Sequence, residues 1–311
     1  MARVVVCGIG AIGVEVLKHL AERSHEIVGV ADSDISKAGK AVSELAGLPI
    51  ELRVRPSIRA LQLDGVDVVV FATSSRISAI EADVAQAILG GADVVTTSEE
   101  MAYPQLASGE AAGRIDRLAK EKGVTVVGVG VNPGFVMDWV PAVVSSASKN
   151  PTVIHVVRSV DVSKRRRQLQ AKTGVGLTRA KFERGLADGV LGHVGLAESA
   201  HLIALSLGRK LEGLSQGTFP VLGAEDYVMG VRQFAEGKAG GCSIRLDLEM
   251  TITSADFDTV EVKGEPNLKL RFERGVFGDS ATVALTVSAV ERVAGARPGL
   301  ITVLELPLIR S

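Results

Sequence analysis

Two adjacent glutamates follow an apolar run in the first half of the chain. Glu99 and Glu100 come directly after "ADVVTTS", which has the pattern of a buried strand. The end of a buried strand is a costly place for unpaired negative charge, so we expect at least one carboxylate to meet a positive charge. One of the two can instead cap a helix expected to begin near Tyr103 and Pro104. A site for a cationic ligand and a helix cap both remain open interpretations.

A glycine motif lies at the start of the chain. Gly8, Gly10 and Gly13 form G-x-G-x-x-G between the apolar run "RVVVC" and a helix predicted from about Ala11. In a dinucleotide-binding motif the first glycine permits the turn, the second lets backbone N–H groups approach a pyrophosphate, and the third allows close helix packing. The helix N-terminus, with the backbone of Ala11 and Ile12, attracts the anion. The alternative is a tight structural turn without a ligand.

Other polar residues follow the later strands. Asp32 ends the second apolar run, "EIVGVAD", near the spacing at which an acidic residue binds the adenosine ribose, which favours NAD over NADP. It can alternatively cap a helix that begins after "SDIS". Thr73 and Ser74 end the third strand, and we expect them to contact the adenosine or pyrophosphate side of the cofactor. Asn132 lies beyond the fifth strand, so we expect it to border the nicotinamide together with the glutamates.

The order of apolar runs predicts an α/β fold with two domains. In residues 1–134 short runs rich in valine alternate with helical patterns, as in a Rossmann-type doubly wound parallel sheet. In residues 135–280 runs of period two, such as "SIRLDLEMTIT", predict an α+β substrate domain with a mainly antiparallel sheet. Residues 281–311 have the pattern of a strand followed by a helix, a segment that can return to the first domain.

Composition narrows the classes of partner. The 35 basic and 36 acidic residues nearly cancel, which argues against nucleic acid and favours small molecules. No apolar run reaches the roughly 18 residues that a membrane helix requires, and the apolar start lacks a signal-peptide pattern. Cys7 and Cys242 form no metal or redox motif, so we expect no metal and a reducing cytoplasm.

Six stretches of the chain resemble the 2,4-diaminopentanoate dehydrogenase family, whose close relatives include native amine dehydrogenases. The resemblance extends over nearly the whole chain and is not confined to the glycine motif. The stretches are "TTSEEMAYP", "GVGVNPGFVMD", "RRRQLQAKTGVGLT", "GHVGLAESAHLIALSLG", "VEVKGEPNLKL" and "ARPGLITVLELP".

The resemblance implies oxidative deamination of a small amine or diamino acid, with NAD or NADP taking the hydride and ammonia leaving. Homoserine dehydrogenases are similar at this strand end but carry a lysine, which suits a developing alkoxide. An amine substrate arrives as an ammonium and passes through an iminium, which a carboxylate stabilises. The same carboxylate can accept the ammonium proton and activate the hydrolytic water. This role is assigned to Glu99, with Glu100 as the second candidate.

The second domain is expected to recognise the substrate and to form a homodimer. In the run Lys164–Arg167, an arginine, taken here as Arg166, can form a fork with a substrate carboxylate, although the run can also be a solvated face. His193 can line the same pocket, or it can be a surface or helix-capping residue. Phe135 can form an apolar wall of the pocket, or it can pack in the core. Strands with one uncovered face favour association of two copies.

Two other functions are compatible with the first domain. One is an imine reductase that resembles dihydrodipicolinate reductase, but the paired histidines and the lysine of that family are missing from this sequence. The other is a non-catalytic dinucleotide sensor, for which the sequence shows no DNA-reading motif and no long coiled coil.

Overall fold

The computed structural model describes residues 1–307 of the chain. The chain forms two units, one made of Met1–Gly134 with Gly278–Ser311 and the other of Phe135–Phe277. Residues 308–311, the end of the expected C-terminal segment, lie outside the described residues. None of the described helices is long and apolar enough to cross a membrane.

A parallel sheet of six strands forms the centre of the first unit in the described part of the chain. Its order is β12-β5-β4-β3-β1-β2, and every neighbouring pair of strands is parallel. All valines of these strands except the half-buried Val28 are buried, as expected for a sheet covered by helices on each side. This confirms the predicted doubly wound α/β fold. The strands are β1 (Arg3–Cys7), β2 (Glu26–Ala31), β3 (Val68–Phe71), β4 (Asp93–Thr96), β5 (Thr125–Gly128) and β12 (Gly299–Ile301).

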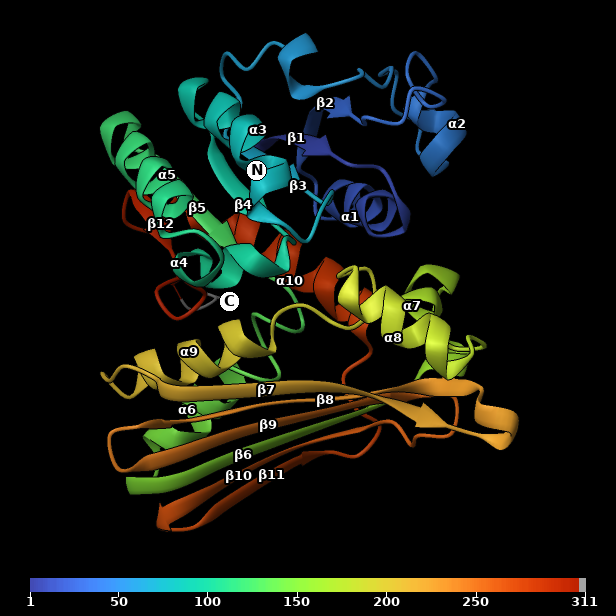
Figure 1. Ribbon diagram of the computed structural model, residues 1–311. Coiled ribbons are helices and arrows are strands. Elements are labelled where there is room, and N and C mark those ends of the chain that lie inside the picture. Colours follow the sequence, from blue (N-terminus) through green and yellow to red (C-terminus); the bar gives the residue numbers. More distant parts are fainter. Residues whose placement is uncertain (308–311) are drawn as a thin grey trace. The chain divides into compact units, whose positions relative to one another are not determined.

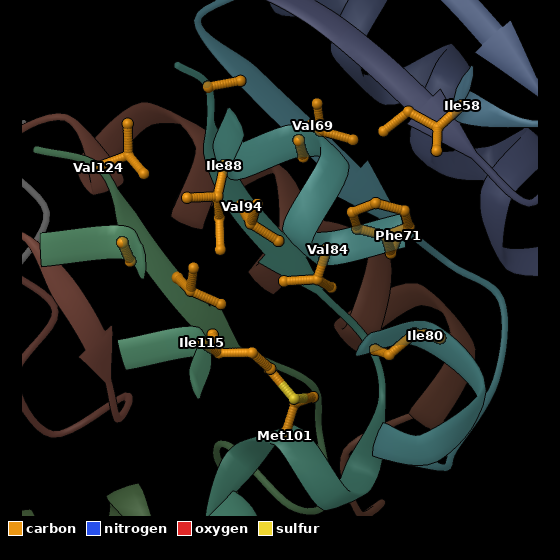
Figure 2. Packing of buried hydrophobic residues seen from close by; sticks show 14 of the residues in the cluster. Ile58, Val69, Phe71, Ile80, Val84, Ile88, Val94, Met101, Ile115 and Val124 are labelled. Carbon is orange, nitrogen blue, oxygen red and sulfur yellow. The ribbon is translucent and has the colours of Figure 1, made fainter. Parts of the chain in front are cut away.

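Helices cover the two faces of this sheet in pairs. Helices α3 and α5 pack together on one face, and α1 and α10 pack together on the other (Figure 1). Figure 2 shows Ile80, Val84 and Ile88 of α3 in one apolar cluster with Phe71 and Val94 of the sheet. The α-helices of this unit are α1 (Ala11–Glu22), α2 (Val42–Ala46), α3 (Ile77–Leu89), α4 (Pro104–Ala107), α5 (Gly109–Lys122) and α10 (Gly278–Val293), and the 3-10 helices are η1 (Ile58–Ala60) and η2 (Glu99–Ala102).

The C-terminal segment has its two elements in the opposite order from the prediction. A strand followed by a helix was predicted, but the run "SATVALTVSAV", which is rich in β-branched residues, lies in helix α10, and the strand β12 follows it. Val283, Val287 and Val290 of α10 are buried, and α10 packs against α1, β3 and β4. Burial of this apolar stripe outweighs the weak intrinsic preference for a strand.

The second unit contains a mixed sheet of six strands in its described residues. Its order is β11-β10-β6-β9-β8-β7, and all neighbours are antiparallel except β6 and β9. The predicted α+β organisation with a mainly antiparallel sheet is therefore confirmed. The strands are β6 (Lys149–Asp161), β7 (Glu212–Leu222), β8 (Val228–Ala239), β9 (Cys242–Thr251), β10 (Phe257–Glu265) and β11 (Leu268–Phe272).

One face of this mixed sheet is covered and the other is polar. Helices α6 and α9 contact each other and pack on the same face, where Val156, Ile244 and Leu246 are buried (Figure 1). The alternate residues, such as Arg245 and Asp247, are half-exposed on the opposite face. The helices of this unit are α6 (Trp139–Ser146), α7 (Arg167–Lys172), α8 (Arg179–Ala187) and α9 (Leu196–Ser206), with the 3-10 helices η3 (Val162–Lys164) and η4 (Ala224–Asp226).

Candidate functional site

The glycine motif forms a tight turn between β1 and α1. Gly8 has a φ of +88°, and a Cβ atom there would lie 2.5 Å from the carbonyl oxygen of Ala72. A Cβ at Gly13 would lie 1.8 Å from the carbonyl oxygen of Gly8, so the third glycine is required by packing. Gly10 is different, because a Cβ there would meet no protein atom within 4 Å. Protein packing therefore does not explain the second glycine, whereas close approach of a ligand does.

The N-terminus of α1 fits an anion. Gly10 is the N-cap, and it supplies no side chain to bind the first N–H groups of the helix. Among the described residues, the backbone N–H groups of Ala11 and Ile12 have no hydrogen-bond partner. Free N–H groups and the positive end of the helix dipole suit the pyrophosphate of a dinucleotide. Thr73 and Ser74, which follow β3, lie in the loop that packs beside Gly8.

Asp32 lies at the end of β2, next to the glycine turn. Its carboxylate accepts hydrogen bonds from the backbone N–H groups of Ile9 and Asp34, each at 2.8 Å, and from the Lys37 ammonium at 2.8 Å. Burial opposes the charge, but the Lys37 ammonium and the two N–H donors outweigh it and hold the pKa of Asp32 below its usual value. No helix begins directly after it, because α2 begins at Val42, so the alternative of a helix cap at Asp32 is wrong.

Glu100 has a structural role. Its side chain is largely buried and accepts one hydrogen bond from Arg76 Nη1 at 2.7 Å and another from the backbone N–H of Ile77 at 2.8 Å. The expected helix cap therefore exists, but on α3, whose first residue is Ile77, and not on the helix at Pro104. Sequence reasoning missed Arg76, which precedes its partner by 24 residues.

Glu99 lies beside this pair in η2 and is half-buried. Among residues 1–307 its carboxylate has no hydrogen-bond or ion-pair partner, in contrast to that of Glu100. It follows β4, so it lies at the carboxyl edge of the sheet, where ligands of doubly wound folds bind. Glu99 is therefore the member of the pair whose charge is available to a ligand.

Two more polar groups at the same edge have no partner in the described structure. The Ser98 hydroxyl follows β4, and the Asn132 side-chain oxygen follows β5; both atoms are buried and without a hydrogen bond. Because β4 and β5 are neighbours, these groups lie at adjacent strand ends. Buried polar atoms are rarely left unpaired without a reason, and a bound polar ligand is such a reason. Ser98 was missed by sequence reasoning, although it directly precedes the glutamates.

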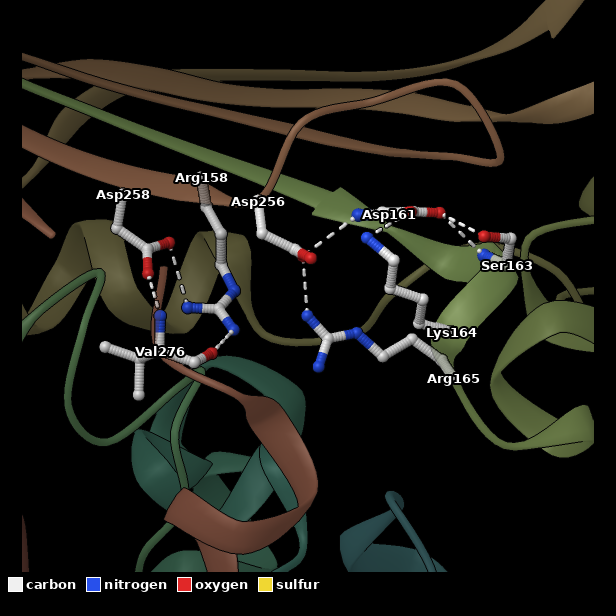
Figure 3. A network of polar contacts seen from close by, with 8 residues as sticks. All are labelled: Arg158, Asp161, Ser163, Lys164, Arg165, Asp256, Asp258 and Val276. Atoms are coloured by element: carbon white, nitrogen blue, oxygen red, sulfur yellow. Dashed lines mark hydrogen bonds and ion pairs between the residues drawn. The ribbon is translucent and has the colours of Figure 1, made fainter. Parts of the chain in front are cut away.

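Arg165 is the buried member of the basic run in the second unit. Its side chain is 5% exposed, and Nη2 donates to Asp256 at 2.6 Å (Figure 3). The guanidinium also lies 4.0 Å from the centre of the Phe277 ring. Nε and Nη1 are buried and have no partner among the described residues. Arg166, the arginine chosen from the sequence, is exposed at the N-cap of α7.

Arg158, a second buried arginine of this unit, differs from Arg165 in its hydrogen bonds. Arg158 on β6 donates from Nη1 to Asp258 at 2.9 Å and from Nη2 to the carbonyl oxygen of Val276 at 2.7 Å (Figure 3). Burial opposes both charges, lowering the pKa of Arg158 and raising that of Asp258 against their mutual attraction. No nitrogen of Arg158 is left buried and unpaired, so Arg165 is the arginine with donors available to an anion.

The remaining candidates belong to the second unit. Phe135 stacks on Trp139, with ring centres 5.7 Å apart, and is half-buried. Gln233 holds the backbone of His193, accepting from its N–H at 2.7 Å and donating to its carbonyl oxygen at 3.1 Å. His193 does not cap α9, whose N-cap is Gly195. Among the described residues no cluster of histidine, cysteine or acidic side chains is suited to a metal ion.

Comparison with known families gives a match for each part of the chain. Residues 135–311 match the 2,4-diaminopentanoate dehydrogenase C-terminal domain, and residues 8–130 match the NAD binding domain of homoserine dehydrogenase. The chain is 28% identical to the 2,4-diaminopentanoate dehydrogenase of Acetoanaerobium sticklandii, in an alignment that covers 99% of this chain and 94% of that one. The glycine turn and Asp32 thus belong to a domain that binds NAD or NADP.

Solved structures share the fold. An amine dehydrogenase from Mycobacterium smegmatis has a TM-score of 0.89 at 23% identity, covering 100% of this chain and 97% of that one. Biliverdin reductase from Synechocystis sp. PCC 6803, solved with biliverdin and NADP+, has a TM-score of 0.59 at 12% identity over 98% of this chain and 94% of that one. The family match covers more than half of the chain, and the chain therefore belongs to the 2,4-diaminopentanoate dehydrogenase family.

Proposed function

We propose that the protein catalyses the oxidative deamination of a small amine or diamino acid that carries a carboxylate, and reductive amination in the reverse direction. One substrate ammonium, one NAD(P)+ and one water give a ketone, NAD(P)H, an ammonium ion and a proton. The names of the relatives in Acetoanaerobium sticklandii and Mycobacterium smegmatis support the amine as the reacting group.

The observation that carries this proposal is that the two adjacent glutamates differ in their partners. Glu100 is held by Arg76 and the N-terminus of α3, whereas Glu99 has no partner among the described residues. An unpaired carboxylate at the sheet edge that binds the nicotinamide favours a substrate with positive charge at the reacting carbon. Oxidation of an alcohol to a ketone would instead develop negative charge on the oxygen bound to that carbon, and a carboxylate would oppose this charge.

The protein's own groups then have defined tasks. The bound nucleotide supplies the acceptor or donor of the hydride. Glu99 accepts a proton from the substrate ammonium and releases it to solvent. The carboxylate, negative again, stabilises the iminium and then accepts a proton from the water that attacks the iminium carbon. Ser98 and Asn132 supply buried polar atoms at the same strand ends, and they are suited to orient the reacting groups.

Arg165 supports the second part of the proposal, a substrate with a carboxylate. Asp256 and Phe277 hold its guanidinium in place, and Nε and Nη1 remain as two separate charged donors for a carboxylate. A carboxylate ligand would satisfy donors whose burial is otherwise unfavourable. This assigns to Arg165 the role that the sequence suggested for Arg166. Phe135 and His193 remain proposed lining residues.

The proposed reaction is tested by following the reduction of NAD+ and NADP+ with a panel of amines. We expect turnover with 2,4-diaminopentanoate or a related amino acid, and weaker turnover with the matched diamine that lacks the carboxylate. Turnover of alcohols but not of amines would contradict the proposal. Cofactor binding without turnover of any amine would indicate a dinucleotide sensor instead.

We further propose that two copies associate through the polar face of the mixed sheet. On this face Phe219 is 56% exposed and stacks on Phe234, at 6.2 Å between ring centres, and Arg245 lies over Phe234. A sheet face that combines exposed aromatic rings with charges of both signs suits a self-complementary interface. Light scattering should give the mass of a dimer, and Phe219→Glu should shift it toward the monomer. A wild-type monomer at micromolar concentration would refute this association.

Both cysteines support a reducing compartment, which we propose to be the cytoplasm. Cys7 and Cys242 are free and buried, and burial raises the pKa of each thiol.

A further inference from the structure

An ion pair occupies the end of β2, where a dinucleotide-binding domain meets the adenosine ribose. Lys37 Nζ lies 2.8 Å from Asp32 Oδ2 and 3.8 Å from Asp34 Oδ2. The Lys37 side chain is 25% exposed and that of Asp32 is 9% exposed, so the lysine lies nearer to solvent than the aspartate.

The ion pair with Lys37 alters the effect of Asp32 on the choice between NAD and NADP. A bare carboxylate at this position repels the 2′-phosphate of NADP, which is why it usually indicates NAD. Here the ammonium of Lys37 compensates that charge. A carboxylate has about four lone-pair positions, and the three donors on Asp32 leave one for a ribose hydroxyl.

Asp32 also keeps partners when the lysine moves. The backbone N–H groups of Ile9 and Asp34 bind one oxygen each, and both bonds are independent of the Lys37 side chain. Lys37 can therefore turn from Asp32 to a phosphate without leaving a buried carboxylate unpaired. Asp34 opposes a phosphate, but its side chain is 48% exposed and its charge is screened by solvent and salt.

We propose that Lys37 is a specificity-determining residue that allows the protein to bind NADP as well as NAD. With NAD bound, Lys37 stays on Asp32, which faces the ribose hydroxyls. With NADP bound, the Lys37 ammonium becomes the counter-ion of the 2′-phosphate. The inference rests on dinucleotide binding by the first unit and is independent of the proposed amine chemistry.

Titration of the purified protein with NADH and with NADPH, followed by nicotinamide fluorescence, tests this without any amine. For the wild type we expect dissociation constants within about tenfold of each other. Lys37→Gln should raise the constant for NADPH by about tenfold or more and change that for NADH by less than about threefold, a selective loss of one charged contact. Lys37→Arg should retain most of the NADPH affinity.

Lys40→Gln is the matched control, because Lys40 is exposed in the same loop and, within residues 1–307, only its backbone forms hydrogen bonds. It should leave both constants unchanged. Added salt should weaken NADPH binding more than NADH binding in the wild type, and this difference should shrink in Lys37→Gln. If Lys37→Gln weakens both cofactors equally, Lys37 only supports Asp32 and the proposal is wrong. Failure of the wild type to bind NADPH would equally overturn it.

Discussion

Glu99→Gln should lower turnover of the amine by about 10²- to 10⁴-fold, as for the loss of a general base. Glutamine keeps the size and the polarity of the side chain but has neither its negative charge nor its basicity. The glycine turn and Asp32 are the groups proposed to hold the nucleotide, so its dissociation constant should change by less than about threefold. The turnover number at saturating amine and cofactor, together with a fluorescence titration of the cofactor, measures both effects.

Glu100→Gln is the control for this substitution. It weakens the ion pair with Arg76 and the cap on α3, so it should cost roughly 1 kcal/mol in the free energy of unfolding, measured with urea. Turnover should stay within about threefold of the wild type. If Glu100→Gln abolished turnover and Glu99→Gln spared it, the two roles would be exchanged. Normal turnover by both variants would refute the electrostatic account of the site.

Arg165→Lys should reduce kcat/KM for an amino acid substrate by about 10- to 150-fold, which corresponds to the 1.5 to 3 kcal/mol of a charged hydrogen bond. Lysine keeps the positive charge beside Asp256, so the fold should survive, but its single ammonium does not replace the separate Nε and Nη1 donors of the guanidinium. Because this contact is made before the reaction, most of the change should be in KM. Steady-state kinetics with a carboxylate substrate and with its carboxylate-free counterpart separate the effects.

The comparison between substrates decides the role of Arg165. The carboxylate-free amine should be turned over equally well by the variant and the wild type. Arg167→Lys, a change at an exposed residue of the same basic run, should leave both substrates unaffected. An equal loss on both substrates would show that Arg165 only supports the fold of the second unit.

Local patterns in the sequence were enough to predict the first unit. The glycine turn was recognisable because its three glycines have a fixed spacing directly after a buried strand, and buried parallel strands leave continuous apolar runs. Helix α10 was misread because its β-branched run is helical only through packing against α1, β3 and β4. A single sequence does not show which distant surface such a run will meet.

The site residues that could not be chosen from the sequence depend on long-range partners. Glu100 pairs with Arg76, which lies 24 positions earlier in the chain. Arg165 pairs with Asp256, which lies 91 positions later. In both cases adjacent residues of the same type have the same local pattern, and only burial against a distant partner separates them. The ion pair of Asp32 and Lys37 is local in sequence, but its proposed role in cofactor choice depends on how far each side chain is buried.

The contribution of Gly278–Ser311 to the first unit has a consequence for synthesis of the chain on the ribosome. Residues 1–134 contain the glycine turn, but the edge strand β12 and the helix α10 that covers β3 and β4 are translated after the whole second unit. Until they emerge, an apolar face and a sheet edge of the nascent nucleotide-binding unit are open to wrong partners. The intervening residues 135–277 are continuous and can fold first, so the unit that begins the chain is the last to be completed.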